Sequence, residues 1–185
     1  MEIYWESYGD RGTPLVVSHE GFGLIGMSGE LIDRLAENRR VIALELQGHG
    51  HTRDIARPFS YEAFGDDVAG VLGHLGLEEA DLMGYSLGAG AGLRAAIQHP
   101  GLIRRLAVGG LPFRRDGWFP EVRASMDQMT SAGFDYMQHS PQYDAWSQVA
   151  PDPDAFPALM DKMGDLLRQP YDWSDEIRAL RPQML

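Results

Sequence analysis

The chain alternates short apolar runs with longer segments in which apolar residues recur every three or four positions. The short runs have the length of buried strands, and the longer segments carry one apolar face, as amphipathic helices do. Strands that alternate with helices indicate a parallel sheet joined by right-handed crossovers. The predicted fold class is therefore α/β, with a mostly parallel sheet and flanking helices. The predicted strands are residues 15–17, 41–44, 80–83 and 103–108, and the predicted helices are residues 30–38, 61–75 and 87–98.

The pattern changes after Pro112. Strand-like runs stop, and methionine and aromatic residues appear at helical spacing as far as Trp173, which predicts a helical lid over the sheet. Ser174 is then expected to cap a short helix, and residues 182–185 are expected to open another strand. The predicted organisation is a core at residues 1–111, the lid at residues 112–173, and a return to the core at residues 174–185 that is cut off at the start of a strand.

Composition narrows the classes of partner and the location. The chain has 185 residues, 44% of them hydrophobic, and a formal net charge of −11. This acidic balance argues against nucleic acid or an anionic membrane as a partner, since phosphate binding needs a basic surface. The absence of cysteine excludes disulfides and thiolate chemistry. No apolar run reaches the length of a membrane span, and the first residues lack a signal-peptide pattern, so a cytoplasmic location is expected.

A G-x-S-x-G pattern runs from Gly84 to Gly88, between a predicted strand and a predicted helix. A serine at such a turn has a strained backbone, and glycine two positions away on either side removes the side chains that would collide. The turn places the Ser86 hydroxyl where a helix begins, so the free N–H of Leu87 and the helix dipole face a developing oxyanion. Ser86 is therefore the predicted nucleophile, and Leu87 is a predicted oxyanion donor.

A second oxyanion donor is expected from the loop after the first predicted strand. Residues 18–23 occupy this place, and Gly21 or Phe22 is the predicted donor. His19 is expected to orient the loop by hydrogen bonding rather than to transfer protons. Glu20 brings a carboxylate beside the oxyanion site, where its charge would oppose catalysis unless it points away.

Together these residues resemble the α/β-hydrolase superfamily over essentially the whole chain. The resemblance implies the fold predicted above, here incomplete at its C-terminal end. Residues 16–23 look like the family's His-Gly oxyanion loop, and residues 84–88 look like its nucleophile elbow, with Gly84 and Gly88 as the elbow glycines. Residues 112–173 look like its helical lid, and residues 45–52 look like its Asp-x-x-Gly-x-Gly-x-Ser loop, with Glu45 and Thr52 as departures.

The resemblance also implies a catalytic acid and then a histidine later in the chain than Ser86. It places the acid after the strand that would begin at residue 184, and the histidine after the next strand, so neither position lies in this sequence. A serine without a base is a poor nucleophile, and this chain alone is expected to be inactive or weak. The expected explanation is a fragment, with a missing segment or a second chain completing the sheet. The alternative partners within the sequence are His139, with Asp116 or Asp135 as its orienting acid.

No cofactor and no metal are expected. His49 and His51 flank Gly50, and with no third ligand in the pattern they are interpreted as loop residues rather than as metal ligands. His99, which precedes a proline at the end of a predicted helix, is expected to face the helix's last carbonyl groups.

The first function hypothesis is a serine hydrolase that acts on a carboxylic ester or lactone through an acyl-enzyme on Ser86. The expected partner is a small-molecule substrate with an apolar portion, because the predicted lid is rich in methionine and aromatic residues. The alternative is a non-catalytic binding module that keeps the pocket but lacks the base. An inert structural fragment is the third possibility. The candidate substrate-pocket residues are Tyr85, Trp118, Met126, Met137 and Trp146.

Overall fold

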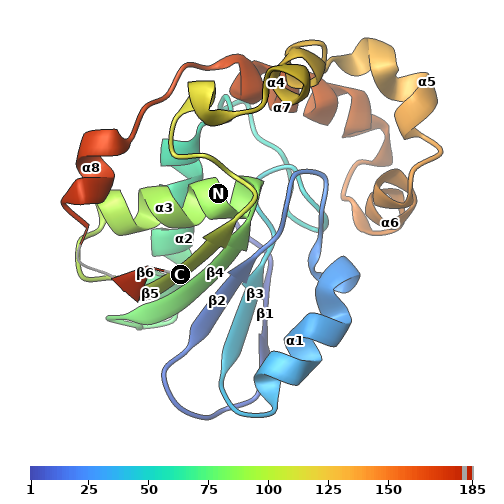
Figure 1. Cartoon of the computed structure of the whole chain (residues 1–185). Coiled ribbons are helices and arrows are strands. Elements are labelled where there is room, and N and C mark those ends of the chain that lie inside the picture. The colour runs from blue at the N-terminus through green and yellow to red at the C-terminus, as the bar shows by residue number, and fades with distance from the viewer. Residues whose placement is uncertain (181–182, 185) are drawn as a thin grey trace.

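The computed structural model describes residues 1–180 and the backbone of residues 183–184. Within these residues, six strands form one sheet in the order β1-β3-β2-β4-β5-β6. The pair β1 and β3 is antiparallel, and every other neighbouring pair is parallel, as Figure 1 shows. The strands are β1 (Trp5–Tyr8), β2 (Leu15–Ser18), β3 (Val41–Leu44), β4 (Ala80–Tyr85), β5 (Ile103–Gly109) and β6 (Gln183–Met184).

The central strands are buried on both faces, which explains why they consist of continuous apolar runs. Every residue of β2 and β3 is buried. In the parallel register, Ser18 at the end of β2 lies beside Leu44 of β3 and Gly84 of β4. The loops that follow these strands therefore leave the sheet along one edge, and two of them carry the predicted catalytic residues.

Helices cover both faces of the sheet. Figure 1 shows α1 on one face, and α2 and α3 on the other. The helices α2 and α3 approach closely at Gly65, where an added Cβ would lie only 2.8 Å from the backbone nitrogen of Ala95. Among the residues that the structure describes, no helix combines the length and the apolar character that crossing a membrane requires. The bounds are α1 (Gly29–Ala36), α2 (Tyr61–His74), α3 (Leu87–Gln98) and α8 (Ser174–Arg178).

Residues 112–173 form the helical segment, which Figure 1 shows above the carboxyl ends of the parallel strands. Several side-chain hydrogen bonds fasten this segment to the loop after β3, including those from Lys162 to Asp54 and to the Ile55 and Arg57 carbonyls. Trp146 Nε1 donates to the carbonyl of Gly48 at 3.0 Å, and Gln169 Nε2 donates to the carbonyl of Phe59 at 3.0 Å. The segment contains α4 (Pro120–Asp127), α5 (Phe134–Met137), α6 (Pro141–Val149) and α7 (Phe156–Arg168), and the 3-10 turns of the chain are η1 (Ile25–Ser28), η2 (Arg115–Gly117), η3 (Ser131–Gly133) and η4 (Pro153–Ala155).

The structure confirms the predicted α/β fold with its mostly parallel sheet, and it corrects three details. The antiparallel strand β1 is not among the predicted strands. Trp173, not Ser174, is the N-cap of α8, and the Asp172 side chain accepts a hydrogen bond from Ser174 N at 2.9 Å. His99 Nε2 lies 2.9 Å from Asp66 Oδ1, so its imidazole turns to a carboxylate on α2 rather than to helix-end carbonyls. Of the strand expected at residues 182–185, β6 confirms residues 183–184, and Pro182 and Leu185 lie outside the described residues.

Candidate active site

Ser86 lies at the turn between β4 and α3 and has an unusual backbone conformation. Its φ of 50° and ψ of −111° fall in a region that L-residues other than glycine rarely occupy. Backbone hydrogen bonds hold the turn in place: Ser86 N donates to the Gly109 carbonyl at the end of β5 at 2.8 Å, and Gly90 N donates to the Ser86 carbonyl at 3.1 Å. Strain of this kind persists only where the surroundings enforce it, and it concentrates at functional sites.

The glycines on either side of Ser86 are required by close backbone contacts. A Cβ added at Gly84 would lie 2.3 Å from the carbonyl oxygen of Gly88. A Cβ added at Gly88 would lie 2.3 Å from the carbonyl oxygen of Ser18. Strand β4, the first turn of α3 and the end of β2 therefore meet at distances that only glycine allows.

The loop after β2 has the second unusual backbone conformation. Phe22 has a φ of 62°, and among the described residues Phe22 and Ser86 are the two non-glycine residues with positive φ. The loop closes a turn through Gly23 N, which donates to the Glu20 carbonyl at 3.0 Å. It is joined to the start of α3 because Gly88 N donates to the His19 carbonyl at 2.9 Å. The loop that contains Phe22 is thus hydrogen-bonded directly to the first turn of α3, which follows Ser86.

His19 fastens this loop to the chain after β3. The ring is buried; its Nδ1 lies 2.7 Å from the Glu20 carbonyl oxygen, and its Nε2 accepts a hydrogen bond from Leu46 N at 3.1 Å. This pair of partners requires a neutral ring with the proton on Nδ1. Burial lowers the pKa of His19, which favours the same neutral form. The geometry agrees with the expectation that His19 orients the loop by hydrogen bonding.

The Glu20 carboxyl group folds back along its own turn. Its Cδ lies 3.1 Å from the position that a Cβ on Gly23 would occupy, so the glycine leaves room for the acid. The effect of Glu20 on catalysis stays a prediction.

Glu45 holds two loop segments together, a structural role that its sequence context did not reveal. Its carboxylate is fully buried, and Oε1 accepts from Ile25 N at 3.0 Å while Oε2 accepts from His51 N at 2.6 Å. Thr52 Oγ1 donates to the Glu45 carbonyl at 2.6 Å. Gly50 is needed here because an added Cβ would collide with the Glu45 carboxylate. One buried acid therefore joins the loop after β3 to the residues that follow the Phe22 loop.

His49 is buried beside His19, with ring centroids 5.0 Å apart. Its Nδ1 lies 3.0 Å from the Gln47 carbonyl oxygen, and its Nε2 has no partner within the described residues. Burial lowers the pKa of His49 to about 3, so the ring is neutral at physiological pH. Among the described residues, no group of three or more His, Cys, Asp or Glu is placed to hold a metal ion.

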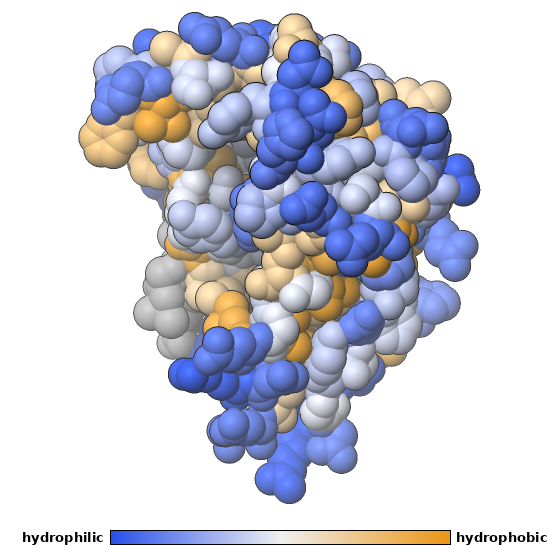
Figure 2. All heavy atoms as spheres, turned by 90° about the vertical axis from the view of Figure 1, so that its right-hand side faces the viewer, coloured by the Kyte–Doolittle hydropathy of each residue, from blue (hydrophilic) through white to orange (hydrophobic). Residues whose placement is uncertain are grey.

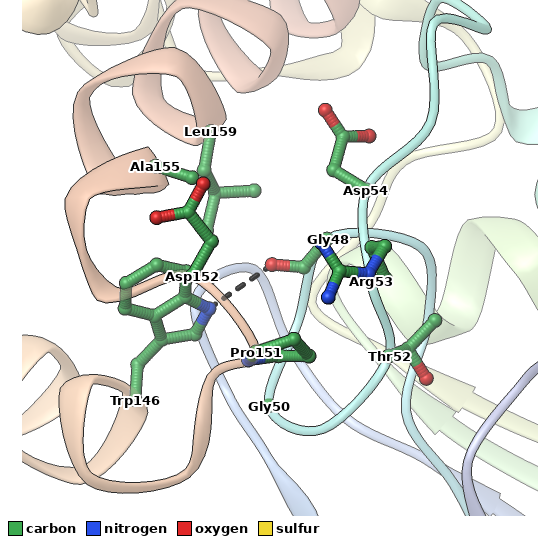
Figure 3. A pocket seen from close by; sticks show the side chains of 10 residues that line it. All are labelled: Gly48, Gly50, Thr52, Arg53, Asp54, Trp146, Pro151, Asp152, Ala155 and Leu159. Atoms are coloured by element: carbon green, nitrogen blue, oxygen red, sulfur yellow. Dashed lines mark hydrogen bonds between the residues drawn. The ribbon is translucent and has the colours of Figure 1, made fainter.

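The candidate substrate-pocket residues are not gathered in one place. Tyr85 is 59% exposed, and its ring lies over Gly110. Trp118 Nε1 donates to the Tyr171 hydroxyl at 3.0 Å within the helical segment. Trp146 is 3% exposed and lines a small pocket over the loop after β3, where Figure 3 shows its bond to the Gly48 carbonyl. Met126 and Met137 are half-buried on α4 and α5.

An open groove joins the Phe22 loop to the helical segment. It has a volume of about 640 Å³, and Gly21 and Phe22 form one of its sides. Met129 and Met137 line it from the helical segment, so Met137 is the one candidate pocket residue that the structure brings to the Phe22 loop. On the face turned to the viewer in Figure 2, apolar surface gathers between the helical segment above and the region of α1 below.

The model of the alpha/beta hydrolase fold family matches residues 14–178 of the chain. The 2-hydroxymuconate semialdehyde hydrolase of Pseudomonas sp. (strain CF600) is 37% identical over 103 residues, which cover 54% of this chain and 36% of that protein. The chain spans about a third of the length of the curated relatives that it matches.

Solved structures show the same fold. A thermophilic esterase from Thermogutta terrifontis gives a TM-score of 0.74 at 22% identity, covering 98% of this chain and 72% of that one. The enol-lactonase from Burkholderia xenovorans LB400 gives a TM-score of 0.66 at 20% identity, covering 98% of this chain and 75% of that one. The family match begins one residue before β2, ends with α8 and includes the Ser86 turn, so the chain belongs to the alpha/beta hydrolase fold family.

Proposed function

We propose that the protein is a serine hydrolase that cleaves a carboxylic ester or lactone through an acyl-enzyme on Ser86. The observation that carries this proposal is the backbone of Ser86, whose φ of 50° presents a hydroxyl at the start of a helix. Conformational strain at such a position has no structural benefit of its own, which favours a functional reason for it. The esterase and the lactonase that share the fold act on the proposed bond types, and they support the substrate class.

In the proposed first step, Ser86 Oγ attacks the substrate carbonyl carbon and its proton passes to a base. The carbonyl oxygen becomes an oxyanion that accepts hydrogen bonds from Leu87 N–H and from Gly21 or Phe22 N–H. Leu87 is suited to this role because the first N–H groups of a helix have no partner within the helix. Gly88 N is excluded as a donor, since it is already bonded to the His19 carbonyl.

The tetrahedral intermediate then collapses, the alcohol leaves with a proton, and an acyl group remains on Ser86. Water activated by the same base attacks the acyl carbon, and a second collapse releases the carboxylic acid and restores the Ser86 hydroxyl. The apolar portion of the substrate occupies the groove between Phe22 and Met137, because this groove begins at the proposed oxyanion donors. No cofactor takes part in these steps.

The base is the part of the mechanism that the described residues do not supply. The imidazoles of His19, His51 and His99 have other partners, and the buried His49 ring is bonded to Gln47 through Nδ1. No imidazole within residues 1–180 is hydrogen-bonded to Ser86 Oγ. His139 is exposed and lines the groove, which keeps it as the alternative base within this chain. We therefore propose that a protein made of these residues alone has weak hydrolase activity or none.

The test is covalent labelling with an alkyl fluorophosphonate, followed by peptide mass spectrometry. It uses this chain and, if its gene reads on past Leu185, the complete product. We expect the adduct on Ser86, formed slowly in this chain and faster in the complete product, no adduct in a Ser86→Ala variant, and unchanged labelling in the matched Ser131→Ala variant. Labelling that survives Ser86→Ala would contradict the proposal.

The missing imidazole favours one second candidate, a binding module that retains the fold and the groove without catalysis. A folded, complete product that binds apolar esters in the groove but takes up no fluorophosphonate would establish this candidate. Labelling at Ser86 would exclude it.

A further inference from the structure

The groove beside the Phe22 loop carries one full charge. Its apolar sides come from Phe22, Met129 and Met137, and Asp135 is the acidic residue that lines it. No lysine or arginine is among the described residues that line the groove. Asp135 is exposed on α5, and within the described residues its carboxylate forms no ion pair. A ligand in the groove therefore meets an unpaired negative charge.

Two arginines of the helical segment, Arg168 and Arg115, already have partners within that segment. Arg168 Nη1 donates to the backbone carbonyl of Met129 at 3.0 Å, and Arg168 Nη2 pairs with Asp165 at 2.9 Å. Arg115 pairs with Asp127. An Arg168 that swung toward the groove would leave the Met129 carbonyl and the Asp165 carboxylate without this partner. The whole chain adds to the effect, because its formal net charge of −11 makes the long-range field negative.

An anionic group in this groove would have no cation to pair with, and losing water without a partner is unfavourable for a carboxylate. A neutral group loses little there, and an ammonium group gains an attraction to Asp135. From this charge pattern we infer that the substrate portion remote from the reacting carbonyl is uncharged or cationic, and that esters carrying a remote carboxylate bind more weakly. The inference rests on the proposed function only for the position of the reacting carbonyl at the Phe22 loop.

Three esters of equal chain length separate the cases: dimethyl suberate, monomethyl suberate, and methyl 8-aminooctanoate. They carry a neutral, an anionic and a cationic group at the end remote from one methyl ester. Binding is measured on the Ser86→Ala protein, so that no ester is consumed, by the ¹³C-methyl signals of its methionines. We expect the Met129 and Met137 signals to move, with the ammonium ester binding about fivefold tighter than the carboxylate ester, the effect of one exposed charge on ligands of opposite sign.

The Asp135→Asn variant is expected to reduce that ratio to less than about twofold, whereas the matched Glu121→Gln variant, an exposed acid on α4, is expected to retain it. His139 also lines the groove, and a His139→Gln variant shows whether its imidazole contributes to the ratio. The inference is overturned if the carboxylate ester binds as tightly as the other two, or if the ligands move signals other than those of Met129 and Met137.

The outcome is independent of the nucleophile, because the measurement uses a protein without Ser86. Failure of the charge preference with fluorophosphonate labelling intact at Ser86 would refute this inference alone. Loss of labelling with the charge preference intact would refute the serine mechanism and leave the groove's selectivity standing.

Discussion

The substitution Gly88→Ala tests whether the strand, the helix and the Phe22 loop meet as closely as the structure indicates. The added Cβ would lie 2.3 Å from the Ser18 carbonyl oxygen, 2.6 Å from its carbon, and 2.7 Å from the His19 carbonyl oxygen. All three are backbone atoms, so no side-chain rotation relieves the collision. The start of α3 must move away from the end of β2 by about 1 Å to reach ordinary van der Waals contact.

The expected cost follows from two contributions. Overpacking of this kind costs about 1–3 kcal/mol, and weakening the 2.9 Å bond from Gly88 N to the His19 carbonyl costs about 1 kcal/mol more. Replacing glycine in a helix returns about 0.5–1 kcal/mol. We therefore expect Gly88→Ala to lower the free energy of unfolding by about 1–3 kcal/mol, and to slow fluorophosphonate labelling about 100-fold, because a shift of 1 Å misplaces the catalytic groups.

Gly70→Ala is the matched control. Gly70 lies within α2, and an added Cβ there meets no atom within 4 Å. This variant is expected to gain about 0.5–1 kcal/mol and to label at the wild-type rate. Both free energies are measured by urea unfolding followed by circular dichroism. If Gly88→Ala is as stable as Gly70→Ala, the close approach at Gly88, and with it the placement of the Ser86 turn, is wrong.

Three further predictions concern strain, buried histidine and the attachment of the helical segment. Ser86→Gly is expected to be about 1 kcal/mol more stable than Ser86→Ala, because glycine tolerates a φ of 50°; equal free energies of unfolding would show that the turn is relaxed. For His49, whose folded pKa is lowered to about 3, the unfolded chain binds a proton that the folded chain excludes, so stability is complete above about pH 6.5 and falls toward pH 3. That loss approaches ~1.4 kcal/mol per pH unit, and urea unfolding at pH 7.5, 6 and 5 should show a shallower dependence in His49→Asn; parallel curves would contradict the assignment. Lys162, the chain's only lysine, donates to both oxygens of Asp54 at 2.8 and 2.6 Å and is 23% exposed, so an amine-reactive ester should modify the N-terminus well before Lys162. Lys162→Met should lose about 1–3 kcal/mol on urea unfolding, and equally rapid modification of both amines would show that this attachment is absent.

The sheet could be predicted because burial on both faces leaves a simple signature. The runs at residues 15–17 and 41–44 are apolar at every position, and the structure buries all of them. Strand β1 does not follow from the pattern because it is an edge strand with the mixed sequence Trp-Glu-Ser-Tyr, and within the described residues it pairs only with β3. Antiparallel pairing at an edge depends on the partner strand, which a local pattern does not reveal.

The candidate site could be predicted only where it depends on the local sequence. The position of Ser86 follows from local rules, because a glycine pattern between a strand and a helix specifies the turn. The groove does not follow from local rules, because it depends on how the helical segment lies on the Phe22 loop. The methionine-rich and aromatic composition of the segment made Met137 and Trp146 equal candidates, but the indole of Trp146 bonds to the Gly48 carbonyl and only Met137 lines the groove. Tertiary packing decides which carbonyl group the Trp146 indole meets, and a local pattern does not reveal it. Tertiary packing also places Asp135 in the groove, whereas the sequence suggests it only as an orienting acid for His139.

A crystal structure of the phosphonylated protein is the sharpest test of Ser86 as the nucleophile. We expect phosphorus bonded to Ser86 Oγ, with the phosphonyl oxygen about 2.7–3.1 Å from Leu87 N and from the backbone nitrogen of Gly21 or Phe22. We also expect the alkyl chain to lie along Met129 and Met137. An adduct whose phosphonyl oxygen points to solvent, with neither loop donating to it, would show that the Ser86 turn and the Phe22 loop do not form an oxyanion site.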